Sequence, residues 1–377
     1  MRIRLFVEPE TVYNDFTGNY PGLFQANNRC GAVIRKNMEE TMDFDAIMTE
    51  ITSGLTDDPK KDIQYLLEES EKYKDHEMSK EILRAVGRLI ADRIPEDMKK
   101  ELDGILEKEM VGHEAFFEEV DFCVYRKEYD KALSLLEPLV EKTKGMFEDD
   151  SQSEYHYFDE PFEEMLYLNL MNPQKDVRRA SFPFTKLYIR RAGILYEMGR
   201  HEEAVQSCET ALKWNPVHAG VIFELAENKK MLGDLDSYFS LTRDAFKKVF
   251  RPRDLAHCYR NMAYWFVERE LYREAMGCLL ISLQYEDHRV ARSELLYIQS
   301  QAGPKIKPPT EKQFEAVSKK YGFPIGPDKD VVGLAFALGS HCFEDKVYDG
   351  ARYYWMIVND LVQDEDLAEM INNLPEK

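Results

Sequence analysis

Histidine, cysteine and glycine are the residues whose spacing would first reveal an active site or a metal site in this chain. A metal-binding helix face needs histidines three or four positions apart, and no two of the eight histidines have that spacing. The cysteines form no CxxC pair, and no GxxxxGK[ST], GxGxxG, HExxH or GxSxG motif occurs. The sequence therefore predicts no catalytic residue, no cofactor and no metal, and we expect a protein that is not an enzyme.

The charge balance excludes another class of partner. The chain has 50 lysines and arginines against 70 aspartates and glutamates, for a formal net charge of −20. Nucleic-acid-binding proteins usually carry a basic patch or stripe, whereas here acids are mixed with bases and outnumber them. We therefore expect no nucleic-acid partner. No stretch reaches the roughly 18 to 20 apolar residues of a membrane span, so we expect no membrane partner either.

Two further features predict a cytoplasmic location. Only Leu5, Phe6 and Val7 precede Glu8 where a signal peptide would need a longer apolar segment. Five of the six cysteines fall one per predicted helix at helix-packing positions, which is typical of small buried side chains in a reduced compartment. Nothing in the sequence specifies an oligomeric state.

Residues 185 to 218 place small and large side chains at the intervals that two packed antiparallel helices require. Small residues recur where the helices would touch, and Gly and Pro occur where each helix would end. With Thr185 as place 1, these are Ala192 at place 8, Gly199 at 15, Ala204 at 20, Ala211 at 27 and Pro216 at 32. This pattern resembles the tetratricopeptide repeat, a 34-residue helix-turn-helix unit.

The same pattern recurs along the chain. Residues 256 to 289 and 332 to 365 repeat it well, and residues 219 to 252 keep most of it but have Tyr238 at the small place 20. Residues 113 to 146 form a degenerate copy. The resemblance implies an all-α protein in which these hairpins stack into a right-handed superhelical solenoid, with divergent helices at its N-terminal end.

The predicted organisation has five parts. Residues 1–41 form a poorly structured leader, because residues 1 to 37 hold five bases and three acids in an otherwise acidic chain and show no helical period. Residues 42–112 form an N-terminal helical segment, which is either a divergent repeat with a cap or a small bundle. It has amphipathic helices at about 59 to 73 and 77 to 92, and a third helix at about 95 to 110 that starts at Pro95. The others are a solenoid at 113–301, a linker at 302–310, which has three prolines, and a C-terminal repeat and cap at 311–377.

An insertion at about 147–184 interrupts the array. Its first part, residues 147 to 164, has eight acids, no lysine or arginine, and several aromatic side chains. This run is either a solvated acidic loop or a lip that attracts a basic partner. A short helix at about 161 to 171 and a basic loop with Arg178 and Arg179 follow.

The resemblance implies a concave groove lined by the first helix of each repeat. This groove would carry aromatic side chains, charges of both signs and an amide. Such a surface suits an extended peptide, because the peptide backbone needs hydrogen-bond partners and its side chains need pockets. The groove candidates are Lys186, Arg190, Tyr196, Phe223, Glu227, Lys230, Arg260, Asn261 and Tyr264. We thus expect a scaffold that binds a protein or peptide. The alternative is a peptide-sensing cytosolic regulator, similar to quorum-sensing regulators that join an N-terminal helical bundle to a tetratricopeptide array.

Overall fold

The computed structural model describes residues 44, 46–56, 58–74, 76, 78–93, 115–303 and 305–375. In this part of the chain almost all regular structure is helical, and the exceptions are two short strands. The predicted leader at 1–41 and the predicted helix at about 95 to 110 lie outside the described residues.

The N-terminal helices form a small unit with its own core. α3 (Pro59–Lys72) and α4 (Ser79–Arg93) confirm two predicted amphipathic helices, and residues 46–53 form another helix before them. Asp58 starts α3 because its carboxylate accepts the backbone N–H groups of Lys60 and Lys61 at 3.2 and 3.5 Å. The buried core of this unit consists of Phe44, Ile51, Leu66, Ile82 and Val86.

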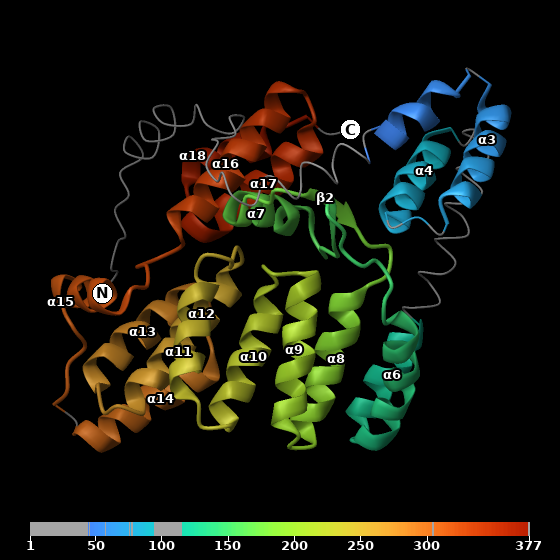
Figure 1. Cartoon of the computed structure of the whole chain (residues 1–377). Coiled ribbons are helices and arrows are strands. Elements are labelled where there is room, and N and C mark those ends of the chain that lie inside the picture. Colours follow the sequence, from blue (N-terminus) through green and yellow to red (C-terminus); the bar gives the residue numbers. More distant parts are fainter. Residues whose placement is uncertain are drawn as a thin grey trace, which may run out of the picture.

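The central part of the chain is a row of antiparallel helical hairpins (Figure 1). Short turns force each pair antiparallel, and Gly199 and Gly233, both with positive φ, end the first helix of two hairpins. The pairs are residues 115–125 with α6 (Tyr129–Thr143), α8 (Phe184–Glu197) with α9 (His201–Trp214), α10 (Ala219–Met231) with α11 (Leu235–Ala245), and α12 (Pro252–Val267) with α13 (Tyr272–Tyr285), followed by α14 (Arg289–Ala302). This packing is consistent with an α-solenoid.

The small residues of the sequence pattern are buried in the helices. Ala192, Ala204 and Ala211 are fully buried in the α8–α9 hairpin, as are Ala263 and Ala275 in the α12–α13 hairpin. Small side chains let the helix backbones approach closely, so a larger residue at these positions would overpack the contact. The described cysteines are free thiols. Burial confirms the predicted packing role of Cys123, Cys208, Cys258 and Cys278, whereas Cys342 is only partly buried.

The insertion after α6 folds as a strand, a helix and a strand. β1 (Ser153–His156) pairs in parallel with β2 (Asp176–Arg179), and α7 (Pro161–Met171) makes the crossover that parallel strands need. The helix predicted at 161 to 171 is confirmed. The prediction of a basic loop was wrong for Arg178 and Arg179, because they pair with Tyr155 and His156.

After α14 the chain turns back instead of adding another hairpin to the row. Residues 306–310 contain no helix, and α15 (Glu311–Tyr321) then packs against α13. The last hairpin packs on α7, and Figure 1 places it with α7 above the row. This segment consists of α16 (Lys329–Glu344), α17 (Tyr348–Val362) and α18 (Glu365–Asn372).

Phe162 joins the insertion to this C-terminal hairpin. Its fully buried ring lies 5.0 Å from the ring of Phe250 and 6.1 Å from that of Tyr354, measured between centroids. The Tyr353 hydroxyl also donates to the Glu160 carboxylate at 3.4 Å. One continuous hydrophobic core therefore runs from α7 through α10–α13 to the C-terminal helices.

Candidate functional site

The predicted groove residues lie on α8, α10 and α12, the first helices of three consecutive hairpins. The structure brings three of them, Glu227, Lys230 and Tyr264, together where α10 meets α12. Lys230 forms an ion pair with Glu227, and its ammonium nitrogen lies 4.7 Å from the ring centroid of Tyr264 and 5.6 Å from that of Tyr238. An ammonium group is thus held by a carboxylate and two aromatic faces.

Arg260 continues this cluster toward α13 and α14. It donates to Glu286 at 2.7 Å and to Ser282 at 3.4 Å, and its side chain is only 14% exposed. Phe223 is buried and stacks on His257 at 4.2 Å between centroids. Burial, followed by the positive charge of Arg260, lowers the pKa of His257 to about 4, so this imidazole is neutral at pH 7.

Several buried polar atoms beside these residues have no hydrogen-bond partner in the described part of the chain. Asn261 is 4% exposed, and its Nδ2 has no acceptor. The Oε2 atom of Glu294 and the Nδ1 atom of His288, which lie on and next to α14, are also buried without partners. Burial raises the pKa of Glu294, while Lys230 and Arg260 act in the opposite direction.

Sequence reasoning missed Glu294, although a signal was present. Glu294 follows Arg260 by one 34-residue repeat length, so it continues the register of the first helices. We define the α10–α14 cluster as Glu227, Lys230, Arg260, Tyr264, Glu286 and Glu294.

Tyr196 lies next to a group of carboxylates that belongs to α8 and α10. Burial and then Glu227, Glu224 and Glu197 raise the pKa of the Tyr196 hydroxyl. Burial and the neighbouring Glu227 and Glu197 also raise the pKa of Glu224. These side chains therefore lie close enough to repel one another when ionised.

The other two predicted groove residues have partners elsewhere. Both guanidinium contacts from Arg190 to Asp121 measure 2.9 Å, and the same group lies 4.7 Å from the ring centroid of Phe117. Lys186 faces the insertion, with its nitrogen 3.9 Å from the Asp159 carboxylate. Arg190 and Lys186 thus help to fix neighbouring elements in place.

The acidic insertion uses several of its carboxylates inside the fold. Glu163 is 6% exposed and accepts hydrogen bonds from the backbone of Asp159 and from Asn215 at 2.8 and 2.9 Å. Glu160 forms an ion pair with Arg251, the N-cap of α12, and Asp159 lies 3.6 Å from His218, the N-cap of α10. These side-chain contacts join the insertion to the row of hairpins.

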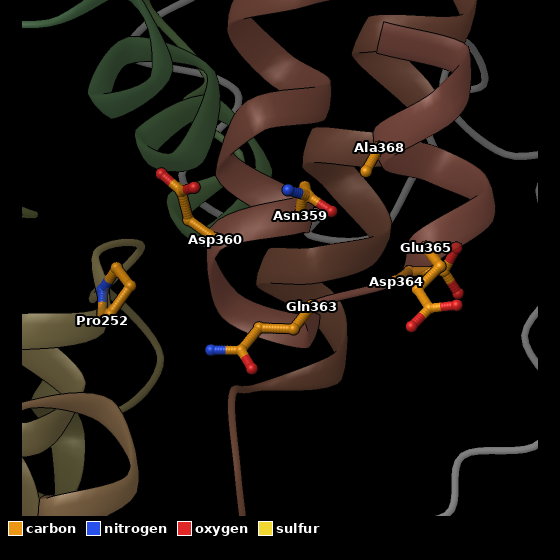
Figure 2. Close-up of a pocket in the computed structure, with 7 residues that line it drawn as sticks. All are labelled: Pro252, Asn359, Asp360, Gln363, Asp364, Glu365 and Ala368. Carbon is orange, nitrogen blue, oxygen red and sulfur yellow. The ribbon is translucent and has the colours of Figure 1, made fainter. Parts of the chain in front are cut away.

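A pocket of about 350 Å³ lies elsewhere, between the start of α12 and the turn from α17 to α18 (Figure 2). Figure 2 shows Asp360 turned toward α7, Gln363 reaching toward Pro252, and Asp364 and Glu365 on the far side. These polar groups do not converge on one point, and Asp364 already caps α18. The lining residues are Pro252, Asn359, Asp360, Gln363, Asp364, Glu365 and Ala368, none of them a predicted groove residue.

Two kinds of site have no support among the described residues. No group of three His, Cys, Asp or Glu side chains in the described ranges is placed to hold a metal ion. No described helix is long and apolar enough to cross a membrane.

Replacing Glu294 by Gln should raise the thermal stability at pH 7. A buried carboxyl whose pKa is raised on folding contributes stability at low pH that is lost as the pH rises through its folded-state pKa. The amide removes that loss, so the difference in melting temperature between the variant and the wild type should shrink toward pH 4. Melting curves from pH 4 to 8 test this, with the exposed Glu209→Gln as the control. A lower melting temperature for Glu294→Gln at pH 7 would contradict it.

No known protein-family model matches this chain, and a search of curated proteins found no similar sequence.

Proposed function

We propose that this protein is a non-enzymatic interaction scaffold that binds a peptide or a helix of another protein along the first helices of its hairpins. The observation that carries the proposal is the set of buried, unpartnered polar atoms of Glu294 and Asn261 beside Lys230, Arg260 and Tyr264. An unsatisfied buried polar atom costs about 1–3 kcal/mol. A bound peptide backbone offers both the donors and the acceptors that these atoms lack.

We further propose that the hairpins belong to the tetratricopeptide class and wind into a right-handed superhelix. The buried small residues at the repeat places and the positive φ of Gly199 and Gly233 support this assignment. In such a superhelix the first helices line the concave side, where an extended chain contacts several repeats at once. The last hairpin departs from this arrangement, because it packs on α7.

Truncating Arg260 and Tyr264 together to Ala should weaken capture of the partner by at least about 2 kcal/mol, the threshold of a binding hot spot. Affinity purification from the native cells with mass spectrometry would identify the partner, and titration with that partner would give the change in Kd. The matched control is Gln206→Ala with Glu209→Ala, two exposed positions on α9.

The folding of the double variant needs its own check, because Arg260 pairs with Glu286 and Tyr264 packs against Tyr238. Circular dichroism and melting curves provide it. If the double variant does not fold, Tyr196→Ala takes its place, since the Tyr196 ring is only partly buried. Full retention of the partner by a folded groove variant would refute the proposed function.

A second candidate function is a peptide-sensing regulator whose N-terminal helices act on another protein. The observation that favours it is the separate hydrophobic core of α3 and α4. Hydrogen exchange of α3 and α4 that changes when the partner peptide binds would favour the regulator over the scaffold.

A further inference from the structure

The row of hairpins ends at α14, which lacks the second helix that each earlier hairpin has. At place 8 of the repeat, Ala192, Ala226 and Ala263 are fully buried in the hairpins that α8, α10 and α12 begin. The same place in α14 is Tyr297, which is 49% exposed, and Leu296 beside it is 68% exposed. Both stay exposed because the chain turns back after α14 and α15 packs on α13.

The other end of the row has an open face as well. Place 10 of the repeat packs against the preceding hairpin. Asn228 lies 3.1 Å from His201 on α9, and the ring of Trp265 lies 4.2 Å from that of Phe239 on α11, measured between centroids. Both place-10 side chains are buried. In the helix at 115–125 the same place is Phe122, which is 58% exposed because the row has no earlier described hairpin.

These two faces carry opposite charges. Glu118 and Glu119 are exposed one turn before Phe122, and no described residue forms an ion pair with either. Arg289 is exposed two turns before Leu296, and it also has no ion pair within the described ranges. Other charged side chains on the two helices are already paired, namely Asp121 with Arg190, Arg126 with Glu128, and Arg292 with Asp287.

We define the start face and the end face by the exposed side chains of these two helices. The start face consists of Glu118, Glu119, Phe122 and Tyr125, and the end face consists of Arg289, Val290, Leu296 and Tyr297. Exposed apolar side chains grouped on one face are typical of an interaction site. Within the row, the matching places are covered by another helix, so a helix is the shape that fits each face.

We propose that the occupant is a second copy of this chain, with the start face of one copy packed on the end face of the next. Each face is a helix with exposed apolar side chains, so each supplies the cover that the other lacks. The acids of the start face then lie near Arg289, and opposite charges at close range attract. The proposal does not involve the groove, so it is independent of the proposed function.

The contact is head-to-tail, because Figure 1 places α6 and α14 at opposite ends of the row. A head-to-tail contact leaves a free face on each outer copy, so further copies can add until a ring closes or a filament grows. The row of hairpins would thereby continue from one copy into the next.

Variants that truncate one face at a time test this proposal. The start-face variant is Phe122→Ala/Tyr125→Ala, and the end-face variant is Leu296→Ala/Tyr297→Ala. The matched control is Val347→Ala/Met356→Ala, two equally exposed apolar positions of the C-terminal hairpin. Sedimentation velocity of the full chain at rising concentration measures the average mass, and melting curves check that each variant folds.

We expect the average mass of wild type and of the control to rise with concentration above that of one chain. Each face variant alone should associate about tenfold or more weakly, because one half of every contact is lost. An equal mixture of the two face variants should form a species of two chains and nothing larger, since only one intact pair of faces remains.

A charge exchange tests the polar part of the contact without removing apolar side chains. Glu118→Lys/Glu119→Lys and Arg289→Glu should each weaken association, and a chain that carries all three changes should recover it. Salt should weaken the association of wild type, because it screens the attraction between exposed charges.

Three results would overturn the proposal. Wild type could remain a single chain at every concentration, or one face variant could associate alone as well as wild type, which would indicate a contact between two like faces. The third result is a mixture of folded face variants that forms no two-chain species. Partner capture by the groove is measured separately, so none of these results bears on the proposed function.

Discussion

Phe162→Ala should lower the free energy of unfolding by about 3–5 kcal/mol, the usual cost of removing a fully buried phenylalanine ring. The ring packs between Phe250 of the central row and Tyr354 of α17, so its loss opens a cavity where the insertion meets the C-terminal hairpin. Chemical denaturation would measure the free energy. Hydrogen exchange should show faster opening of α16–α18 than in wild type.

The control for this change is Leu168→Ala on the same helix. Leu168 is exposed at 36%, so its truncation should cost well under 1 kcal/mol, as surface substitutions usually do. Equal losses for the two variants, or unaltered exchange in α16–α18 of Phe162→Ala, would show that Phe162 does not hold the last hairpin on the insertion.

The hairpins could be predicted from the sequence because their signals are local. The small residues, such as Ala204 and Ala263, recur at fixed places of the repeat. Each is buried within its own hairpin. The helices α3 and α4 were predicted for the same reason, since a 3.6-residue period is visible in a short window.

The placement of the last hairpin could not be predicted, because it depends on contacts between segments far apart in the chain. Glu160 and Tyr353 are 193 residues apart, so their contact has no local signal in the sequence. The strands β1 and β2 were missed for a related reason. Each has only four residues, and a short parallel strand takes its stability from its partner more than from its own composition.

The candidate site was predicted in part. The repeat register placed Glu227, Lys230, Arg260 and Tyr264 on neighbouring helices, and the structure brings them together. The register did not reveal that Phe223 and Asn261 are buried, or that Arg190 binds Asp121. Nor did it reveal that the buried Oε2 atom of Glu294 has no hydrogen-bond partner among the described residues. Those properties depend on which side chains meet across helices, and spacing alone does not determine them.

Gly277→Ala should destabilise the protein although alanine favours a helix. A Cβ atom at Gly277 would lie 2.4 Å from two ring atoms of Phe314 and 3.0 Å from the ring of Pro309, so α15 must move off α13. Overpacking of this kind costs about 1–3 kcal/mol, and the buried Phe314 ring loses its contacts in addition. Chemical denaturation would measure the loss.

Gly193→Ala is the matched control for this last prediction. Gly193 also lies inside a helix, but a Cβ atom there meets nothing within 4 Å. Alanine should therefore stabilise α8 by up to about 1 kcal/mol, so the two glycine variants should differ in sign. Adding Phe314→Ala to Gly277→Ala should cost less than the two separate losses combined, by more than about 0.5 kcal/mol, because both changes disrupt one contact. Additive losses would mean that α15 does not return across α13 at this glycine, and the chain after α14 would then be free to continue the row of hairpins.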